Sequence, residues 1–277
     1  MKKNIAIFSC GDENYVPQMC VALKIACKYN ENFKPYILSD VSDPDLMKTI
    51  NKLGITLLQV DLSQHFEVHN NDWPNHMFWY FLAPETLREL GHDFSIFIDA
   101  DVYCRRELDL DWLIDDVEIA ARSDRDGEFN SGVVFFNNNK MIEKKLFESA
   151  LSVYRRFSGD DYLSWHGGLV HDQQVLTALG SGNKFHDFWG SDTSFDILDL
   201  DVTWNYIFHH SEGRNEKYLK MKIPKLESNL NCIHFLLSRP WLPMNKWGGQ
   251  HGLFHTEDFP NGWVVKTKKG EPKPESR

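Results

Sequence analysis

The first hundred residues alternate between two kinds of segment. Short apolar runs rich in β-branched and aromatic residues are typical of buried strands, and longer runs with apolar residues every three or four positions are typical of amphipathic helices. Regular alternation of the two predicts βαβ units and a parallel sheet. The predicted strands cover residues 5–9, 35–39, 55–60 and 94–98, and the predicted helices cover residues 16–28, 44–53 and 78–90.

Local signals mark the ends of these helices. Asp43 can cap a helix that has Pro44 in its first turn, and Gly54 and Gly91 can end the helices before them. The strand after Gly91 places Asp99 at its carboxyl end. Ligands of open α/β sheets collect at this edge.

The second half of the chain has fewer clear patterns. They predict a strand at residues 132–136, a long helix at 141–157 and a short helix at 172–179. The last twelve residues, 266–277, are mostly Lys, Pro, Gly and Glu and predict a disordered tail. We therefore expect a single α/β domain over residues 1–265, with a mixed, mainly parallel sheet flanked by helices.

Composition excludes several classes of protein. With 277 residues, 42% of them apolar, the chain can bury a substantial core, and its formal net charge of −10 leaves no basic surface for nucleic acid. No run approaches the roughly 18 apolar residues that cross a bilayer, and no secretory hydrophobic segment is present near the start. The five cysteines are odd in number and lack CxxC spacing, which disfavours a disulfide framework and a zinc site. We expect a soluble cytoplasmic protein without a transmembrane anchor.

Two carboxylates follow the strand at 94–98. Asp99 and Asp101 would share one face of an extended chain, where they can approach one Mg²⁺ or Mn²⁺ ion that also binds substrate phosphates. Asp is also common in the turns that follow strands, so a purely structural role is the alternative. The apolar run before Asp99 favours the metal, because neighbouring carboxylates beside a buried strand are desolvated at a cost unless a cation meets them.

The segment Phe-Ile-Asp-Ala-Asp-Val at 97–102 resembles the metal-binding segment of glycosyltransferases with the GT-A fold, in particular family 8, which contains glycogenin and bacterial galactosyltransferases. Further motifs of the family are matched in the same order, so that the resemblance runs from about residue 4 to residue 241. The matching segments are residues 9–15, 130–133 with 135–137, 172–173, 204–205, and His234 with 239–241.

The resemblance implies a metal site and a donor site. Asp99, Asp101 and His234 would be the ligands, a mixture of carboxylate and imidazole that suits Mn²⁺ better than Mg²⁺. A buried core histidine is the alternative for His234. Tyr15 would stack on the uracil of a UDP-sugar, although it could instead pack on the sheet. The other residues implied to contact the donor are Ser9, Asp12, Asp99 and Arg239, the last through its planar guanidinium on the diphosphate.

The resemblance also implies a reaction centre. Asn130, Asp172 and Gln173 would face the transferred hexose or pentose, with a carbohydrate or glycoprotein glycan as acceptor; a helix cap is the alternative role for Asp172. Inversion would need a carboxylate to accept the proton of the acceptor hydroxyl, whereas family 8 implies retention. The candidates for such a base are Asp172 first, then Asp124, Asp126 and Glu128.

The chain departs from the family pattern in two places. Leu237 and Arg239 stand three and five residues after His234, where family members often have Gly at three and Lys at six. Residues 79–83 lack the Arg or Lys that often reaches the donor.

The chain also resembles in size the xylose transferases of large algal viruses.

Two other classes of protein fit part of the sequence. An Asp-x-Asp hydrolase would use one carboxylate as nucleophile, but such enzymes usually have Thr where this chain has Tyr103. A carbohydrate-binding protein without catalysis is suggested by the nine tryptophans, since aromatic faces stack on sugars. Core packing and an acceptor groove are both open for Trp165, Trp189, Trp241 and Trp247.

Overall fold

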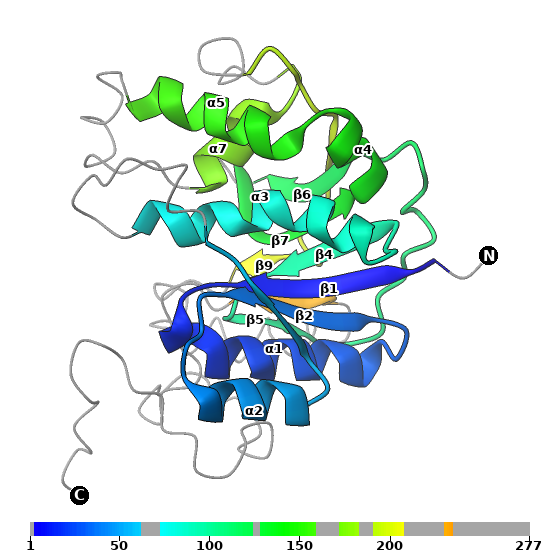
Figure 1. The fold of residues 1–277 in the computed structure, drawn as a ribbon. Coiled ribbons are helices and arrows are strands. Elements are labelled where there is room, and N and C mark those ends of the chain that lie inside the picture. The colour runs from blue at the N-terminus through cyan, green and yellow to red at the C-terminus, as the bar shows by residue number, and fades with distance from the viewer. Residues whose placement is uncertain are drawn as a thin grey trace, which may run out of the picture.

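A seven-stranded sheet forms the centre of the protein, with helices on both of its faces (Figure 1). The structure is a computed structural model and describes residues 3–61, 73–123, 128–158, 172–182, 191–207 and 230–234. The strand order is β3-β2-β1-β4-β7-β6-β8. Neighbours are parallel except where β7 pairs with β4 and with β6. This mixed, mainly parallel sheet confirms the predicted α/β fold class.

The elements follow the predicted alternation in the first half of the chain. They are β1 (Ile5–Cys10), a 3₁₀ helix (Glu13–Tyr15), α1 (Val16–Tyr29), β2 (Lys34–Ser39), α2 (Pro44–Lys52), β3 (Thr56–Gln59), α3 (Trp73–Glu89) and β4 (Phe94–Ile98). The remaining elements are β5 (Val102–Cys104), β6 (Ile119–Ser123), β7 (Phe129–Asn137), α4 (Asn138–Glu143), α5 (Leu146–Ser158), α7 (Asp172–Leu179), β8 (Ile197–Asp199), β9 (Tyr206–Ile207) and β10 (Cys232–His234).

The strands at the centre of the sheet are buried on both faces. Along β1, Ile5 and Ile7 belong to one apolar core, and Ala6 and Phe8 belong to a second core on the other side. Side chains of a strand alternate between faces, so one continuous apolar run supplies both cores. In Figure 1, α1 and α2 cover the first face, and α3, α5 and α7 cover the second.

A second, three-stranded sheet joins distant parts of the chain. Its order is β5-β10-β9, and β10 is antiparallel to β5 and parallel to β9. Cys104 lies opposite Cys232, 128 positions later in the sequence, and their sulfur atoms are 3.5 Å apart. Residues of this small sheet pack into the same apolar core as α1.

The predicted helix at 141–157 is wrong, because the structure has two helices there. α4 ends at Glu143 and α5 begins at Leu146. Lys145 between them has φ of 53°, and a left-handed residue ends an α-helix. The side chain of Lys144 is held by the Glu118 carboxylate at 2.6 Å and by the Ser194 carbonyl at 3.1 Å, which ties the junction to the sheet.

Several other expectations concern absences or chain ends. Among the described ranges, no helix is both long enough and apolar enough to cross a bilayer. All five cysteines are free thiols in the structure. The predicted tail lies outside the described residues, so the boundary at residue 265 stays a prediction.

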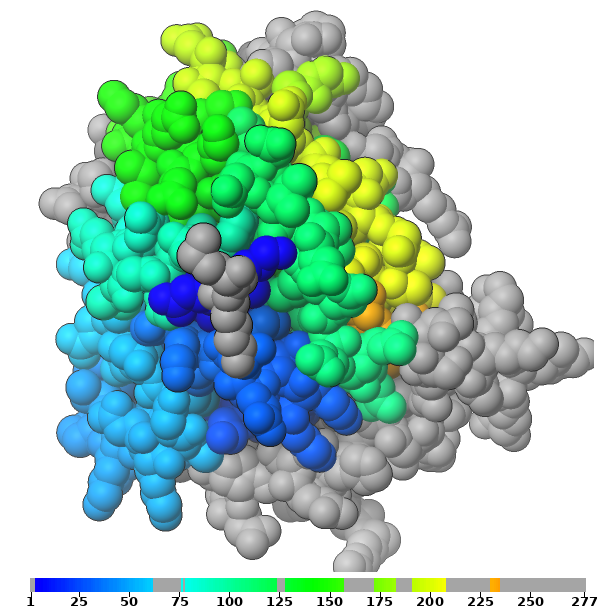
Figure 2. All heavy atoms as spheres, turned by 90° about the vertical axis from the view of Figure 1, so that its right-hand side faces the viewer, coloured from blue at the N-terminus to red at the C-terminus, as the bar shows by residue number. Residues whose placement is uncertain are grey.

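The carboxyl ends of the parallel strands point to one side of the molecule. β1 starts near the N-terminus and runs across Figure 1 away from it. Figure 2 shows the end of the molecule at which β1 begins, where the first described residues (dark blue) lie beside segments from the middle of the chain (green). The Asp99 edge of the sheet is the opposite end, because Asp99 follows the carboxyl end of β4.

We expect Lys145→Gly to raise the free energy of unfolding by about 0.5–1 kcal/mol, because glycine adopts positive φ without the strain of a Cβ. Lys145→Ala is the control, since it keeps the Cβ and removes only the amino group. Urea unfolding measures both variants. Equal stability of the two would show that backbone strain at residue 145 is negligible.

Candidate functional site

The two predicted carboxylates lie in a tight turn at the carboxyl end of β4. The backbone N–H of Asp99 donates to the Gly132 carbonyl of β7 at 3.0 Å, which continues the β4–β7 ladder. The Val102 N–H donates to the Asp99 carbonyl, also at 3.0 Å, and closes the turn. The chain then enters β5, so Asp99 and Asp101 are held between two strands.

The pairing of β5 with β10 places His234 against these carboxylates. His234 lies opposite Val102, the residue after Asp101. Its Nε2 is 3.2 Å from Asp101 Oδ1 and 3.7 Å from Asp99 Oδ2. One ligand atom from each residue can be chosen so that all three lie within 4.8 Å of one another. The structure thus brings together the three residues predicted to bind the metal.

The charges of this cluster depend on one another. Removal from water raises the pKa of Asp99 to about 8; His234 acts in the opposite direction, and the charges of Asp101 and Asp172 raise the pKa further. Burial lowers the pKa of His234, but Asp101, Asp99 and Asp172 outweigh burial and raise it. The Asp99 side chain is 37% exposed, against 2% for His234, so solvent moderates the shift of the carboxyl more than that of the imidazole. Because both pKa values are raised, protons would compete with a cation for these groups, and the affinity for the cation would fall as the pH falls.

The donor set fits a divalent cation. Two carboxylates and one imidazole match the ligands that Mn²⁺ accepts, and Mg²⁺ also uses one or two carboxylates. The cluster is open on one side, because 37% of the Asp99 side chain and 20% of the Asp101 side chain are exposed. A substrate oxygen could complete the coordination from that side.

Gly132 makes room for the imidazole of His234. A Cβ at residue 132 would lie 2.3 Å from His234 Nδ1 and 2.4 Å from its Cε1, well inside van der Waals contact. The ring therefore packs directly against the backbone of β7. The glycine of the segment 130–133 is thus explained by contact with a residue more than a hundred positions later.

A chain of side-chain amides leads from His234 to the predicted reaction centre. His234 Nδ1 lies 3.2 Å from Asn205 Oδ1, and Asn205 Nδ2 donates to Asn130 Oδ1 at 2.6 Å. Asn130 Nδ2 donates to Gln173 Oε1 at 3.0 Å, and Gln173 Nε2 donates to Glu128 Oε2 at 3.3 Å. Asn130 and Gln173, both predicted to face the sugar, are therefore in direct contact with each other.

Asp172 lies near the same cluster. Its charge raises the pKa values of Asp99 and His234, and its carbonyl accepts a hydrogen bond from the Tyr80 hydroxyl at 3.3 Å. It is the first residue of α7 and thus stands within the first helical turn, where a carboxylate is favoured by the helix dipole. Asp172 therefore belongs to the first turn of α7 and also lies close enough to Asp99 and His234 to act on their charges.

The predicted nucleotide-binding turn differs in accessibility from residue to residue. Ser9 is fully buried in β1, so its side chain offers no surface to a ligand. Asp12 caps the 3₁₀ helix by accepting the Asn14 N–H at 2.7 Å. Tyr15 is 43% exposed at the end of that helix, after the carboxyl end of β1. Of the three, Tyr15 has the ring face that stacking would need.

Other predicted residues fall into two groups. Trp79, Tyr80 and Phe81 of α3 are buried in the second core, which accounts for apolar residues where the family often has a cation. The remaining residues, for which the structure gives no placement, are Asp124, Asp126, Trp165, Trp189, Arg239, Trp241 and Trp247, which all lie outside the described residues.

Asn205 and Gly132 have no role that their sequence motifs predict, although both stand in the matched segments. Neither residue is charged or nucleophilic, so its type alone carries no chemical signal. Their contacts with His234 appear only when β10 is in place.

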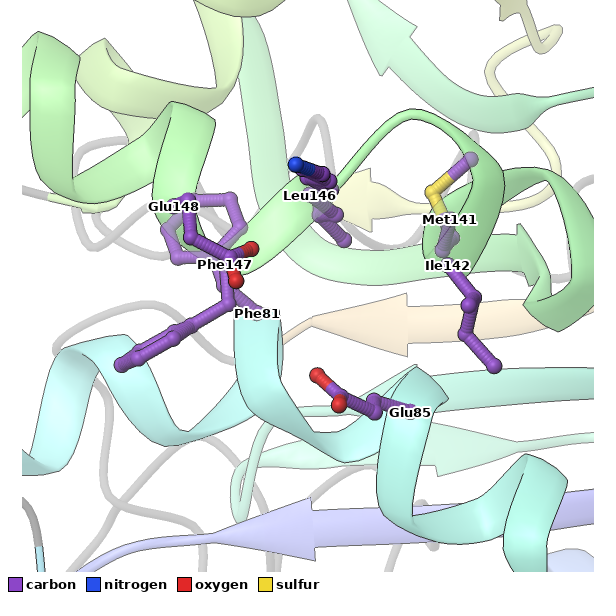
Figure 3. A pocket seen from close by; sticks show the side chains of 8 residues that line it. Phe81, Glu85, Met141, Ile142, Leu146, Phe147 and Glu148 are labelled. Atoms are coloured by element: carbon purple, nitrogen blue, oxygen red, sulfur yellow. The ribbon is translucent and has the colours of Figure 1, made fainter.

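A separate cavity of about 220 Å³ lies between α3 and the α4–α5 pair, and Figure 3 shows the carboxyl groups of Glu85 and Glu148 at it. Partial burial raises the pKa of Glu85, and the charges of Glu148 and Glu89 raise it further. None of the predicted site residues lines this cavity, so it is not the candidate donor site. Its lining consists of Phe81, Glu85, Met141, Ile142, Lys145, Leu146, Phe147 and Glu148.

We expect Gly132→Ala to weaken Mn²⁺ binding and to lower the free energy of unfolding by about 1–3 kcal/mol, because the new methyl group displaces the His234 ring. Gly11→Ala is the control, since its Cβ would meet its nearest atoms at 3.5 Å, an ordinary contact. Its stability should change by less than about 1 kcal/mol. Calorimetric titration measures the Mn²⁺ affinity of both variants, and urea unfolding measures their stability. An affinity and a stability of Gly132→Ala equal to those of the parent would contradict the close packing.

The chain is similar to known glycosyltransferases. No protein-family model matches the chain. Two glycosyltransferases of Streptococcus pneumoniae serotype 4 match 83% of it: GlyD at 28% identity over 290 residues and GlyB at 24% over 251 residues. The chain spans 34% of GlyD and 56% of GlyB, so it corresponds to only part of each.

Solved structures share the fold. The glycosyltransferase GlyE of S. pneumoniae superposes with a TM-score of 0.58 at 19% identity, over 92% of this chain and 61% of GlyE. The galactosyltransferase LgtC, solved with donor and acceptor sugar analogues, superposes with a TM-score of 0.57 at 15% identity, over 90% of this chain and 94% of LgtC. The chain therefore has the GT-A fold and is similar to the glycosyltransferases of family 8.

Proposed function

We propose that this protein is a metal-dependent glycosyltransferase that moves a hexose or pentose from a UDP-sugar to a hydroxyl group of a carbohydrate or glycan. The observation that carries the proposal is the convergence of Asp99, Asp101 and His234 at the carboxyl end of β4. Relatives that are glycosyltransferases support the reaction class. The donor, the metal and the acceptor are part of the proposal.

In this proposal, Asp99, Asp101 and His234 hold a Mn²⁺ or Mg²⁺ ion. Such an ion would supply Lewis-acid stabilisation of the diphosphate leaving group without a proton transfer. The open side of the cluster at Asp99 and Asp101 lets phosphate oxygens approach. The buried His234 would hold the ion from the protein side.

Tyr15 and Arg239 would bind the two ends of the nucleotide. Tyr15 presents an exposed ring beyond the carboxyl end of β1, next to β4 in the sheet, so the uracil and the diphosphate can both lie along this edge. Arg239 would meet the diphosphate through its planar guanidinium. Asp12 keeps the chain turned between β1 and Tyr15.

Asn130, Asp172 and Gln173 would face the transferred sugar. Asn130 and Gln173 are hydrogen-bonded to each other, and Asp172 acts on the charge of the metal cluster, so all three lie in one region. If the reaction inverts the sugar, Asp172 is the first candidate to accept the acceptor proton. If it retains the configuration, as family 8 implies, Asp172 and Gln173 would hold the acceptor on the face of the leaving group.

We expect Asp101→Asn to lower the rate of UDP release from UDP-sugars by about 100-fold or more, since Lewis-acid stabilisation is worth several kcal/mol. A panel of UDP-hexoses and UDP-pentoses with Mn²⁺, Mg²⁺ or chelator measures this rate and also identifies the donor. Asp192→Asn is the control, because the Asp192 side chain is fully exposed and forms a surface ion pair with Arg156. Full activity of Asp101→Asn, or of the parent in excess chelator, would contradict metal dependence.

We expect Tyr15→Ala to weaken UDP binding by about 1–3 kcal/mol, the usual range for a base stacked on an aromatic ring. Tyr29→Ala is a matched control, since Tyr29 is 39% exposed, close to the 43% of Tyr15, but lies at the other end of α1. Isothermal titration with UDP in the presence of Mn²⁺ measures both. Equal affinities of the two variants would assign Tyr15 to packing.

A further inference from the structure

We infer that Asn205 is a positioning residue, which holds the imidazole of His234 with Nε2 toward Asp99 and Asp101 and couples it to Asn130. The inference rests on the proposed metal site. It concerns a residue that binds neither metal nor substrate itself. Its evidence is the direction of the hydrogen bonds on both sides of the Asn205 amide.

The first step is the contact with His234. A neutral imidazole carries one N–H, so Nε2 can ligate a cation only when the proton is on Nδ1. Asn205 Oδ1, 3.2 Å from Nδ1, is an acceptor for that proton. The contact therefore favours the tautomer in which Nε2 has a free electron pair toward the carboxylates.

The second step fixes the orientation of the Asn205 amide. Asn130 Oδ1 accepts the backbone N–H of Gly132 at 2.9 Å, and a backbone N–H can only donate. The oxygen of Asn130 must therefore face Gly132 and Asn205, and Asn205 must turn its NH₂ group toward it, at 2.6 Å. The other end of the amide, the oxygen, is then the end that faces His234.

The hydrogen bonds at the far end of the chain of amides have the same direction as those at Asn205. Asn130 Nδ2 donates to Gln173 Oε1, and Gln173 Nε2 donates to a carboxylate oxygen of Glu128; an ionised carboxylate can only accept. All these bonds run in one direction, away from His234 toward Glu128. The polarity required by Glu128 is the same as the polarity imposed by Gly132.

The surroundings of Asn205 make this arrangement rigid. The residue is fully buried, so water does not compete for its amide. The backbone carbonyl of Asn205 accepts a hydrogen bond from Arg122 Nη1 at 2.6 Å. The turn before Asn205 is closed by Asp201 Oδ1, which accepts the Thr203 N–H at 2.7 Å. Loss of the side chain would leave Nδ1 of His234 and Oδ1 of Asn130 each without this partner.

The test measures the affinity of the full chain for Mn²⁺ alone, by electron paramagnetic resonance of the free ion. We expect Asn205→Ala to bind Mn²⁺ about 10–100-fold more weakly than the parent, the range found when an outer partner of a metal-bound histidine is removed. Asn205→Asp keeps an oxygen for the Nδ1 proton, but it replaces the donor to Asn130 by a second acceptor and adds a negative charge. Its affinity should stay within about threefold of the parent, because carboxylates commonly orient histidine ligands.

Asn138→Ala separates positioning from general loss of stability. Asn138 is also fully buried and also uses both ends of its amide, with Nδ2 2.9 Å from the His92 carbonyl and Oδ1 2.6 Å from Ser95 Oγ. It lies at the opposite end of β4. We expect a lower melting temperature for Asn138→Ala with unchanged Mn²⁺ affinity.

The outcomes are distinct. Parent-like affinity of Asn205→Ala, a loss in Asn205→Asp as large as in Asn205→Ala, or an equal loss in Asn138→Ala would each overturn the inference. If Asn205→Ala does not fold, the Asn205→Asp affinity decides, and a loss beyond about tenfold overturns it. Absence of Mn²⁺ binding by the parent would instead refute the proposed metal site.

Discussion

The candidate site depends on the antiparallel pairing of β5 with β10. Asp101 and His234 are far apart in the sequence, and only the register that sets His234 opposite Val102 brings them to 3.2 Å. A slip of one residue would turn His234 to the other face of the small sheet. Buried residues of both strands, among them Tyr103 and Ile233, pack into the core beneath the large sheet. The same apolar contacts that stabilise the fold therefore also determine the register of the site.

The cluster stores unfavourable electrostatic energy in the folded chain. Asp99 and Asp101 lie close together at the carboxyl end of β4, and the raised pKa of Asp99 reflects loss of hydration together with repulsion. The imidazolium form of His234 relieves part of this repulsion. A divalent cation would relieve more, since it carries two positive charges and is met by both carboxylates. Strongly shifted carboxyl groups of this kind are typical of functional sites.

Sequence patterns predicted the elements whose signals are local. Asp43 and Pro44 marked the start of α2, and the strand at 94–98 and the helix at 172–179 have the predicted bounds. The break at Lys145 was missed because neither glycine nor proline marks it. The strands β5, β6, β8, β9 and β10 were missed because each has only two to five residues, and the pairs β5–β10 and β6–β8 join segments far apart in the sequence. The carboxylates of the site could be recognised by chemical type, whereas Asn205 owes its role entirely to its neighbours.

The contact between Gly132 and His234 makes the residue allowed at position 132 depend on the residue at position 234. While a histidine ring lies on the backbone of β7, no residue with a Cβ fits at position 132 without moving that ring. A relative that replaced His234 by a small residue would lose this restriction and could acquire larger side chains at position 132. Restoring the histidine would then require glycine to return first. Among relatives of this chain, residues 132 and 234 should therefore covary. Once a larger residue has replaced the glycine, the lost histidine cannot easily return.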